Sequence, residues 1–191
     1  MIAIYLLIVF AVWVGLSGVL CRLWWRWRVK EGGNRLLRDA LALVIGVLWL
    51  GASFWYAGGQ TYYYDAQVNR LCAQDGGIKI FEIVKLPKDK FNEWGQPNFF
   101  RPTQGENALG PEYVFKRDVQ HYRDGDPSMY RTSVRVFLSQ GGKLLGESVG
   151  YTRGGGDLPG PGQPSSFSCP ERYGEIPLLT AIFVKKTKEE K

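Results

Sequence analysis

Three cysteines and a single histidine are the residues of this 191-residue chain that most often carry chemistry. Cys72 and Cys169 lie in its polar part, whereas Cys21 ends an uncharged N-terminal run. In an oxidising compartment an even pair of cysteines normally forms a disulfide, and closing so long a loop stabilises a fold by about 4–5 kcal/mol in the chain-entropy model. A reactive or metal-binding pair is the alternative, but C-x-x-C spacing and a nearby histidine are missing. We expect a Cys72–Cys169 bridge and a free thiol at Cys21.

His121 lies close to Asp118 and Asp124 in the sequence. A histidine with a carboxylate partner can act as a general base, which would suit a hydrolase. A lone strand histidine among polar neighbours is more often a surface residue, so a hydrolase that uses His121 is an alternative and not the main prediction.

Other catalytic patterns are missing from the sequence. It contains no G-x-S-x-G, no S-x-x-K and no Walker-type phosphate loop. Gly154–Gly156 with Arg153 could hold an anion, but this run does not open a helix, and we interpret it as a loop. Glu82 and Glu147 would pair as carboxylates only by coincidence. The sequence therefore predicts no catalytic, cofactor-binding or metal-binding residues.

Two uncharged runs are long enough for membrane helices, which need about 20 apolar residues. Met1–Leu20 holds twelve Ile, Leu, Val or Phe residues, and Ala40–Ala57 holds eight. We predict transmembrane helices over residues 1–21 and 40–58. A cleaved signal and a lipoprotein signal at Cys21 are alternatives, but no basic residue precedes Arg22 and bulky residues occupy the expected cleavage site.

Positive charge is concentrated between the two runs. Residues 22–39 carry six Lys and Arg against two acidic residues. Short basic loops stay in the cytoplasm, which places both termini in the periplasm of a two-pass inner-membrane protein. Residues 59–191 carry a net charge of only +2 out of the chain's +6. The exported half therefore gives no electrostatic reason to expect nucleic acid binding.

Aromatic and basic side chains flank both runs, as expected for anchors at the lipid headgroups. A docking patch for a partner is the alternative at the inner boundary. Small residues four apart, Ala11/Gly15 and Ala42/Gly46, suggest close helix packing. The predicted interface anchors are Trp24, Trp25, Arg26, Trp27 and Arg28 at the inner boundary, with Trp55 and Tyr56 at the outer one.

Residues 59–191 are predicted to form one α+β domain, an antiparallel sheet with a leading helix. Apolar residues at helical spacing continue from the second run and stop at Asp75. Alternation of apolar and polar residues, with glycine-rich turns, indicates strands further on. The predicted strands are Ile78–Leu86, Tyr113–Arg123, Tyr130–Leu138, Lys143–Thr152 and Leu178–Val184, with a helical turn or two over Lys88–Trp94 and long loops at 96–111 and 154–166.

Two stretches resemble a group of small, uncharacterised proteobacterial membrane proteins. They are N-R-L-C-A-Q-D-G-G over Asn69–Gly77, with Glu82 and Leu86-Pro87 following, and G-G-D-L-P-G-P over Gly155–Pro161, with P-S-S-F-S-C over Pro164–Cys169. The resemblance implies a Gram-negative inner-membrane setting, often among accessory or phage-related genes, and implies no activity. Both cysteines of the predicted bridge fall inside these stretches.

The sequence thus predicts a non-enzymatic inner-membrane protein. Its partners would be the lipid bilayer and an envelope protein, which the loops at 96–111 and 154–166 would contact, since binding surfaces are often loops on a rigid scaffold. No cofactor is expected. A phage-exclusion or toxin-immunity membrane factor has the same architecture and differs only in its partner.

Overall fold

The computed structural model describes residues 2–29, 34–158, 162–169 and 173–186. The chain divides into two compact units. The hairpin unit comprises Met1–Thr61 and Gly156–Ser165, and the sheet unit comprises Tyr62–Gly155 and Ser166–Lys191.

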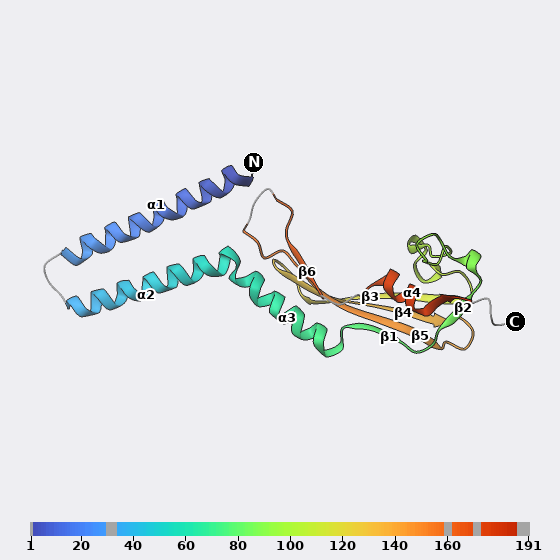
Figure 1. The fold of residues 1–191 in the computed structure, drawn as a ribbon. Helices are drawn as coiled ribbons and strands as arrows, with labels where there is room; N and C mark the ends of the chain where they lie inside the picture. The colour runs from blue at the N-terminus through green and yellow to red at the C-terminus, as the bar shows by residue number, and fades with distance from the viewer. Residues whose placement is uncertain (1, 30–33, 159–161, 170–172, 187–191) are drawn as a thin grey trace. The chain divides into compact units, whose positions relative to one another are not determined.

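Two long helices dominate the hairpin unit. The helices α1 (Ile2–Val29) and α2 (Arg35–Phe54) run antiparallel to each other (Figure 1). Both are long and apolar enough to cross a membrane, and their large apolar side chains, such as Phe10 and Leu43, are exposed. Exposed apolar surface is unfavourable in water by about 25 cal/mol per Å². These helices therefore need an apolar environment or an apolar partner.

The predicted basic loop at 22–39 is shorter in the structure, because both helices extend into it. No proline or glycine interrupts the sequence between Val19 and Glu31, so α1 continues to Val29. Asn34 caps α2 by accepting a hydrogen bond from the Leu36 amide at 3.1 Å. Residues 30–33 lie outside the described part of the chain.

The chain remains helical beyond α2, as the sequence predicts. A π-helical segment, η1 (Trp55–Gly59), contains Gly58 at φ 158° and ψ −8°, which is not a helical conformation. The helix α3 (Gln60–Asp75) follows and ends at the predicted residue. Gly77, two residues after the end of α3, has φ 106°, a conformation that glycine adopts without a steric cost.

An antiparallel sheet forms the centre of the sheet unit, which confirms the predicted α+β class. Its strand order is β1-β5-β4-β3, and β6 also pairs with β5. The strands are β1 (Gly77–Ile80), β3 (Tyr113–Arg123), β4 (Ser128–Leu138), β5 (Leu144–Gly154) and β6 (Ser166–Ser168). The predicted strand at 113–123 matches β3, and β4 and β5 begin and end within two residues of their predicted bounds.

A small second sheet replaces part of the predicted strand Ile78–Leu86. The chain bends after β1, where the amides of Phe81 and Glu82 both donate to the Leu145 carbonyl at 2.9 and 3.0 Å. It then forms β2 (Val84–Leu86), which pairs in parallel with β7 (Phe183–Lys185). One predicted strand therefore becomes two strands in different sheets.

The predicted strand Leu178–Val184 is wrong over most of its length, because the chain forms the helix α4 (Glu175–Ile182) there. A short apolar run does not by its periodicity distinguish a strand from a buried helix. Pro177 suits the first turn of a helix, where its missing N–H breaks no helical hydrogen bond. Leu178 and Ile182, four residues apart, are fully buried.

The loop at 96–111 contains a 3-10 helix, η3 (Pro102–Asn107), followed by the buried residues Ala108 and Leu109. Another 3-10 helix, η2 (Lys88–Lys90), lies within the predicted helical turns at Lys88–Trp94. These segments pack against the first of two apolar clusters in the sheet unit. Its central members are Phe115, Val134, Val136, Leu145, Leu178 and Phe183.

Small residues on β5 let α4 and the segment before it approach the sheet. A Cβ atom at Gly146 would lie 3.0 Å from Ile182 Cδ1, and one at Gly150 would lie 2.0 Å from Tyr173 Cδ2. Ser148 lies between them and accepts a hydrogen bond from the Gly174 amide at 2.8 Å. These positions therefore need small side chains.

The helix α3 packs on the sheet through the second apolar cluster, where Val68 and Cys72 meet Met129, Val149 and Tyr151. Polar contacts fix both ends of this helix. The Asp75 carboxylate accepts the Tyr151 hydroxyl at 2.7 Å and an Arg131 N–H at 3.3 Å. Near the other end, Asp65 accepts a hydrogen bond from Arg153 Nε at 2.5 Å.

Candidate functional site

The two cysteines of the sheet unit, Cys72 and Cys169, are joined in the structure, with their Cα atoms 5.7 Å apart. Both are buried in the second apolar cluster, and the Tyr151 amide donates to Cys169 Sγ at 3.2 Å. They link α3 to the segment after β6 and are not available as thiols. Cys21 is free and exposed.

His121 lies on β3, and its side chain is 57% exposed. Its Nδ1 lies 3.5 Å from Asp124 Oδ1, and its ring centroid lies 6.0 Å from that of Tyr130. Such an exposed pair differs from a buried, oriented catalytic dyad. Among the residues that the structure describes, no group of three or more His, Cys, Asp or Glu side chains is placed to hold a metal ion.

The remaining charged candidates take part in ion pairs. Glu82 pairs with Lys143 at 2.8 Å, and Glu147 pairs with Arg135 at 3.3 Å. Arg153 is buried, and its guanidinium contacts Asp65 and the Gly155 carbonyl. Arg153 therefore serves as a link between α3 and β5.

The predicted interface anchors lie on helical segments of the hairpin unit. Trp25 and Trp27 are exposed near the end of α1, where Arg26 and Arg28 also lie. Trp24 is half-buried, and the Arg28 guanidinium lies 5.4 Å from its ring centroid. At the other boundary, exposed Trp55 and Tyr56 begin η1.

A ring of four hydrogen bonds joins α1 to α2. Trp13 Nε1 donates to Ser53 Oγ at 2.9 Å, and Trp49 Nε1 donates to Ser17 Oγ at 3.2 Å. Each serine hydroxyl donates to the carbonyl of the tryptophan four residues earlier on its own helix, at 2.8 Å in α1 and 2.7 Å in α2. We call this set the tryptophan–serine ring.

The sequence carries a signal for this ring, the repeated spacing W-x-x-x-S at 13/17 and 49/53, which the sequence-based prediction does not include. The small residues four apart suggested close packing instead. A Cβ atom at Gly15 or Gly46 would meet nothing within 4 Å. The helices therefore meet through indole and hydroxyl groups and not through close approach at these glycines.

Strand β3 is the end strand of its sheet, and its last eight residues, 116–123, are all exposed. Within the described part of the chain, its backbone forms hydrogen bonds only with β4. In an antiparallel pair, alternate residues of an end strand point their N–H and C=O groups outward. The outer edge of β3 therefore carries a row of unpaired donors and acceptors.

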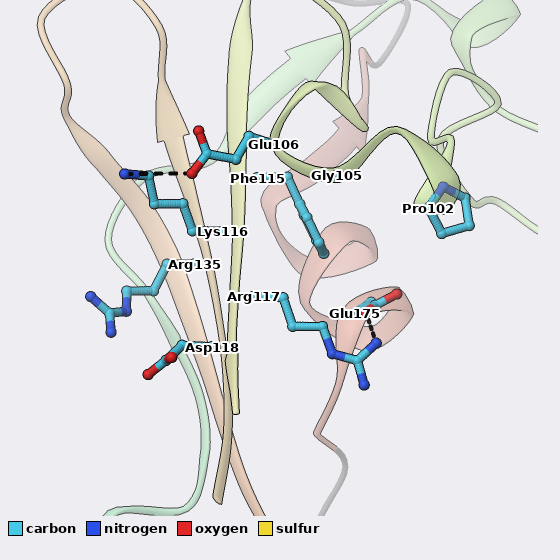
Figure 2. Close-up of a pocket in the computed structure, with 9 residues that line it drawn as sticks. All are labelled: Pro102, Gly105, Glu106, Phe115, Lys116, Arg117, Asp118, Arg135 and Glu175. Carbon is cyan, nitrogen blue, oxygen red and sulfur yellow. Dashed lines mark hydrogen bonds and ion pairs between the residues drawn. The ribbon is translucent and has the colours of Figure 1, made fainter. Parts of the chain in front are cut away.

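A pocket of about 370 Å³ lies along this edge. The segment with η3 bounds it through Pro102, Gly105 and Glu106, and α4 bounds it through Glu175 (Figure 2). The strand itself contributes four consecutive residues, Phe115–Asp118. The pocket therefore lies where a further strand or an extended segment would meet β3.

The side chains at this edge point to both sides of β3 (Figure 2). Lys116 lies on one side, with its Nζ 3.9 Å from Glu106 Oε1. In the strand register, Lys116 of β3 lies opposite Arg135 of β4. Arg117 lies on the other side and donates to Glu175 Oε1 at 3.1 Å. Lys116, Glu106 and Arg117 are more than half exposed, and Glu175 is 25% exposed. Ion pairs near the surface contribute at most about 1 kcal/mol each, so these pairs exchange partners at little cost.

An aromatic layer packs against the start of the strand. Phe115 contacts Phe100 at 5.5 Å between ring centroids, and Tyr113 contacts Phe183 at 5.0 Å. Burial, with a smaller contribution from the neighbouring Glu112 carboxylate, raises the pKa of the Tyr113 phenol above its ordinary value. Phe115 thus gives the pocket an apolar base beneath its charged rim.

Comparison with known protein families, curated proteins and solved structures finds no match for this chain. The site must be interpreted from its own geometry. An unpaired strand edge beside a pocket with exchangeable ion pairs is suited to binding an extended chain.

The two loops predicted as contact surfaces differ in their placement. The loop at 96–111 supplies one wall of the pocket through η3. Most of the loop at 154–166 belongs to the hairpin unit, where Gln60 Nε2 donates to the Gly156 carbonyl at 2.9 Å. In that unit Leu158 also lines an apolar cavity with Phe10 and Phe54. Residues 159–161 are outside the described part.

The edge itself could not be found from the sequence. The sequence predicts that 113–123 is a strand, but it does not give the strand order, and only the order makes β3 an end strand.

Proposed function

We propose that this protein is a non-enzymatic, membrane-anchored binding protein of the bacterial inner membrane. The two exposed apolar helices support the anchoring. The basic stretch 22–39, which covers the end of α1 and the start of α2, supports a cytoplasmic connection with the sheet unit in the periplasm. The resemblance of two stretches to proteobacterial membrane proteins agrees with this setting.

The proposed activity is binding of an extended segment of an envelope protein along β3. The observation that carries it is the unpaired outer edge of this strand beside the pocket. Main-chain hydrogen bonds to a strand edge give affinity, and pockets for alternate side chains give specificity. The eight exposed residues offer an edge of about 26 Å at 3.3 Å per residue.

Charge indicates the chemistry of the partner segment. Residues 116–123 carry three basic side chains, Lys116, Arg117 and Arg123, against the acidic Asp118. A segment with acidic residues would complement this edge. Charged side chains also protect strand edges from unwanted pairing. The pocket at the same edge favours binding over protection alone, because protection needs no concave surface.

Photo-crosslinking from the full-length protein in the inner membrane tests this proposal. A photoreactive phenylalanine at Val119, on the edge of β3, should form an adduct with an envelope protein. Trp94 is 80% exposed and does not line the pocket, so the same group there is the matched control and should form no such adduct.

Charge reversal sharpens the test. The double change Lys116→Glu and Arg117→Glu should reduce the adduct at residue 119 by about tenfold, since two exposed charge contacts contribute up to about 1 kcal/mol each. Lys90→Glu, in η2, should leave it unchanged. Equal adducts from residues 119 and 94 would contradict binding at the edge. A phage or toxin component as the adduct would favour the exclusion or immunity alternative.

A further inference from the structure

The small sheet of β2 and β7 covers the first apolar cluster with one of its two faces. Val84 and Leu86 of β2 pack against that cluster, and Phe183 of β7 belongs to it. Lys85, between Val84 and Leu86, is exposed, because successive side chains of a strand point to opposite faces. The other face of this sheet is therefore open to a partner.

Large apolar side chains are exposed in the bend that leads into β2. Phe81 is 60% exposed, Ile83 is 56% exposed, and Ile80 beside them is 36% exposed. Ile83 lies two residues before Lys85 and so points to the same side of the chain. Single exposed apolar residues are common, but several next to one another mark a surface that binds a partner or a membrane.

Lysines gather at the end of the same small sheet. Its two strands are parallel, with Leu86 opposite Lys185, so both end on the same side. The amide of Lys186 donates to the Leu86 carbonyl at 2.9 Å, which holds this residue beside the end of β2. Lys88 and Lys90 lie in η2, which begins two residues after β2. Figure 1 shows β2 at the end of the main sheet away from α3.

Three of these lysines carry charge that no acidic group offsets. Lys88, Lys90 and Lys186 are exposed and form no ion pair within the part of the chain that the structure describes. Lys185 Nζ lies 5.6 Å from the centroid of the Phe91 ring, a contact that does not neutralise its charge. This end of the sheet unit therefore attracts anions.

The local composition agrees with this charge. Segments 79–90 and 183–186 together carry six lysines and two acidic residues, and one of the two, Glu82, pairs with Lys143. Residues 187–191 lie outside the described part and contain two lysines and two glutamates, so they add no net charge.

We call Phe81, Ile83, Lys88, Lys90 and Lys186 the lysine surface. Cations beside exposed apolar groups complement an anionic bilayer, because the headgroups attract the lysines and the apolar groups enter the boundary of the acyl chains. A soluble polyanion would engage the lysines but would leave Phe81 and Ile83 in water. The pattern therefore favours a lipid surface.

We infer that the lysine surface docks on anionic phospholipids of the bilayer that holds α1 and α2. The inference rests on the proposed anchoring and not on the proposed binding at β3. Anchoring keeps the sheet unit close to this bilayer, so that the surface meets it at an effective concentration in the millimolar range. A few lysines and two apolar side chains are then sufficient for docking.

The test uses the full chain in lipid nanodiscs, with a polarity-sensitive dye attached through Ile83→Cys. Cys21→Ser removes the free thiol, and Cys72 and Cys169 are joined, so the dye labels one site. Its emission should shift to shorter wavelength in discs of equal parts phosphatidylglycerol and phosphatidylcholine, relative to discs of phosphatidylcholine alone. The same dye attached through Val119→Cys, where the native side chain is 42% exposed on β3, should give equal emission in both discs.

Matched variants identify the groups that carry the docking. The two fluorescence lifetimes of the dye give the ratio of docked to undocked chain. Lys88→Gln with Lys90→Gln should lower this ratio about 25-fold, about fivefold for each lysine near an anionic surface. Lys116→Gln with Arg117→Gln removes the same charge from β3 and should leave the ratio unchanged. Phe81→Ser changes no charge and should also lower the ratio, because it removes an apolar group that enters the bilayer.

The outcomes separate this inference from the anchoring on which it rests. A chain that stays outside the discs would overturn the anchoring and, with it, the docking. A chain that enters the discs but gives equal emission in both lipids, or an unchanged ratio in the lysine variant or in Phe81→Ser, would overturn the lysine surface alone. A shift that appears only when phosphatidylglycerol vesicles or heparin are added to phosphatidylcholine discs would show a second membrane or a soluble polyanion as the occupant and would also overturn it.

Discussion

Substituting either cysteine of the Cys72–Cys169 bridge with serine should lower the free energy of unfolding of the sheet unit by about 2–5 kcal/mol. The bridge joins residues 97 apart, and the chain-entropy model gives about 4.7 kcal/mol for a loop of this size. Both residues are buried, at 6% and 7% exposure, so a serine there also places a hydroxyl in an apolar cluster. Domains of this kind are stable by only about 5–15 kcal/mol, so the loss is a large share of the total.

Pulse proteolysis of the full chain in a urea series measures this change, because the protease cleaves only unfolded sheet units. Tryptophan fluorescence would be a poor probe, since the single tryptophan of the sheet unit, Trp94, is exposed. Cys21→Ser is the matched control, because Cys21 is free and exposed, and it should leave the urea midpoint unchanged.

The double variant decides whether the two cysteines act as one link. Cys72→Ser with Cys169→Ser should cost little more than either single change, because each removes the same bond. A double cost close to the sum of the single costs would refute the shared link. So would free thiols at both positions in protein taken from an oxidising periplasm.

Four further predictions concern other parts of the chain. A reporter that is active only in the periplasm should be active when fused after Lys191. The intact mass of the chain should be near 21.6 kDa, with the N-terminal peptide retained. In the tryptophan–serine ring, a double-mutant cycle of Trp13→Phe and Ser53→Ala should give a coupling of about 0.6 kcal/mol, the average for hydrogen bonds between membrane helices, and zero coupling would refute the ring. Burial, with the hydrogen bond to Asp75, raises the pKa of the Tyr151 phenol, so the folded chain keeps this proton where the unfolded chain loses it. The free energy of unfolding should therefore fall as pH rises above about 10, and Tyr151→Phe should fall less steeply in urea titrations across this range.

The elements with clear periodicity were predictable from the sequence. Alternation over 130–138, with the turn at Ser139–Gly142, predicted β4 and the hairpin between β4 and β5, because Val134 and Val136 on one face of β4 are buried. Helical spacing to Asp75 gave α3. Each of these residue patterns arises within a single helix or strand, because one side of that element is buried.

Other features depend on tertiary contacts that the sequence does not show. The helix α4 is a short run in which only Glu175 and Thr180 are polar, so no polar face marks its period. The division of 78–86 into two strands follows from the carbonyl of Leu145, a residue far along the chain. The candidate site depends on strand order, which charge and hydropathy alone do not predict.

The central position of β5 in the sheet has a consequence for export. Gly77 of β1 pairs with Val149 of β5, so the first strand to be made has no partner until most of the chain has followed it. At a synthesis rate of about 5–20 residues per second, this delay is roughly 4–15 s. Under the proposed topology, the segments between them would cross the membrane without a stable sheet to obstruct a narrow translocation channel. The full sheet would then assemble in the periplasm, once β5 has been exported.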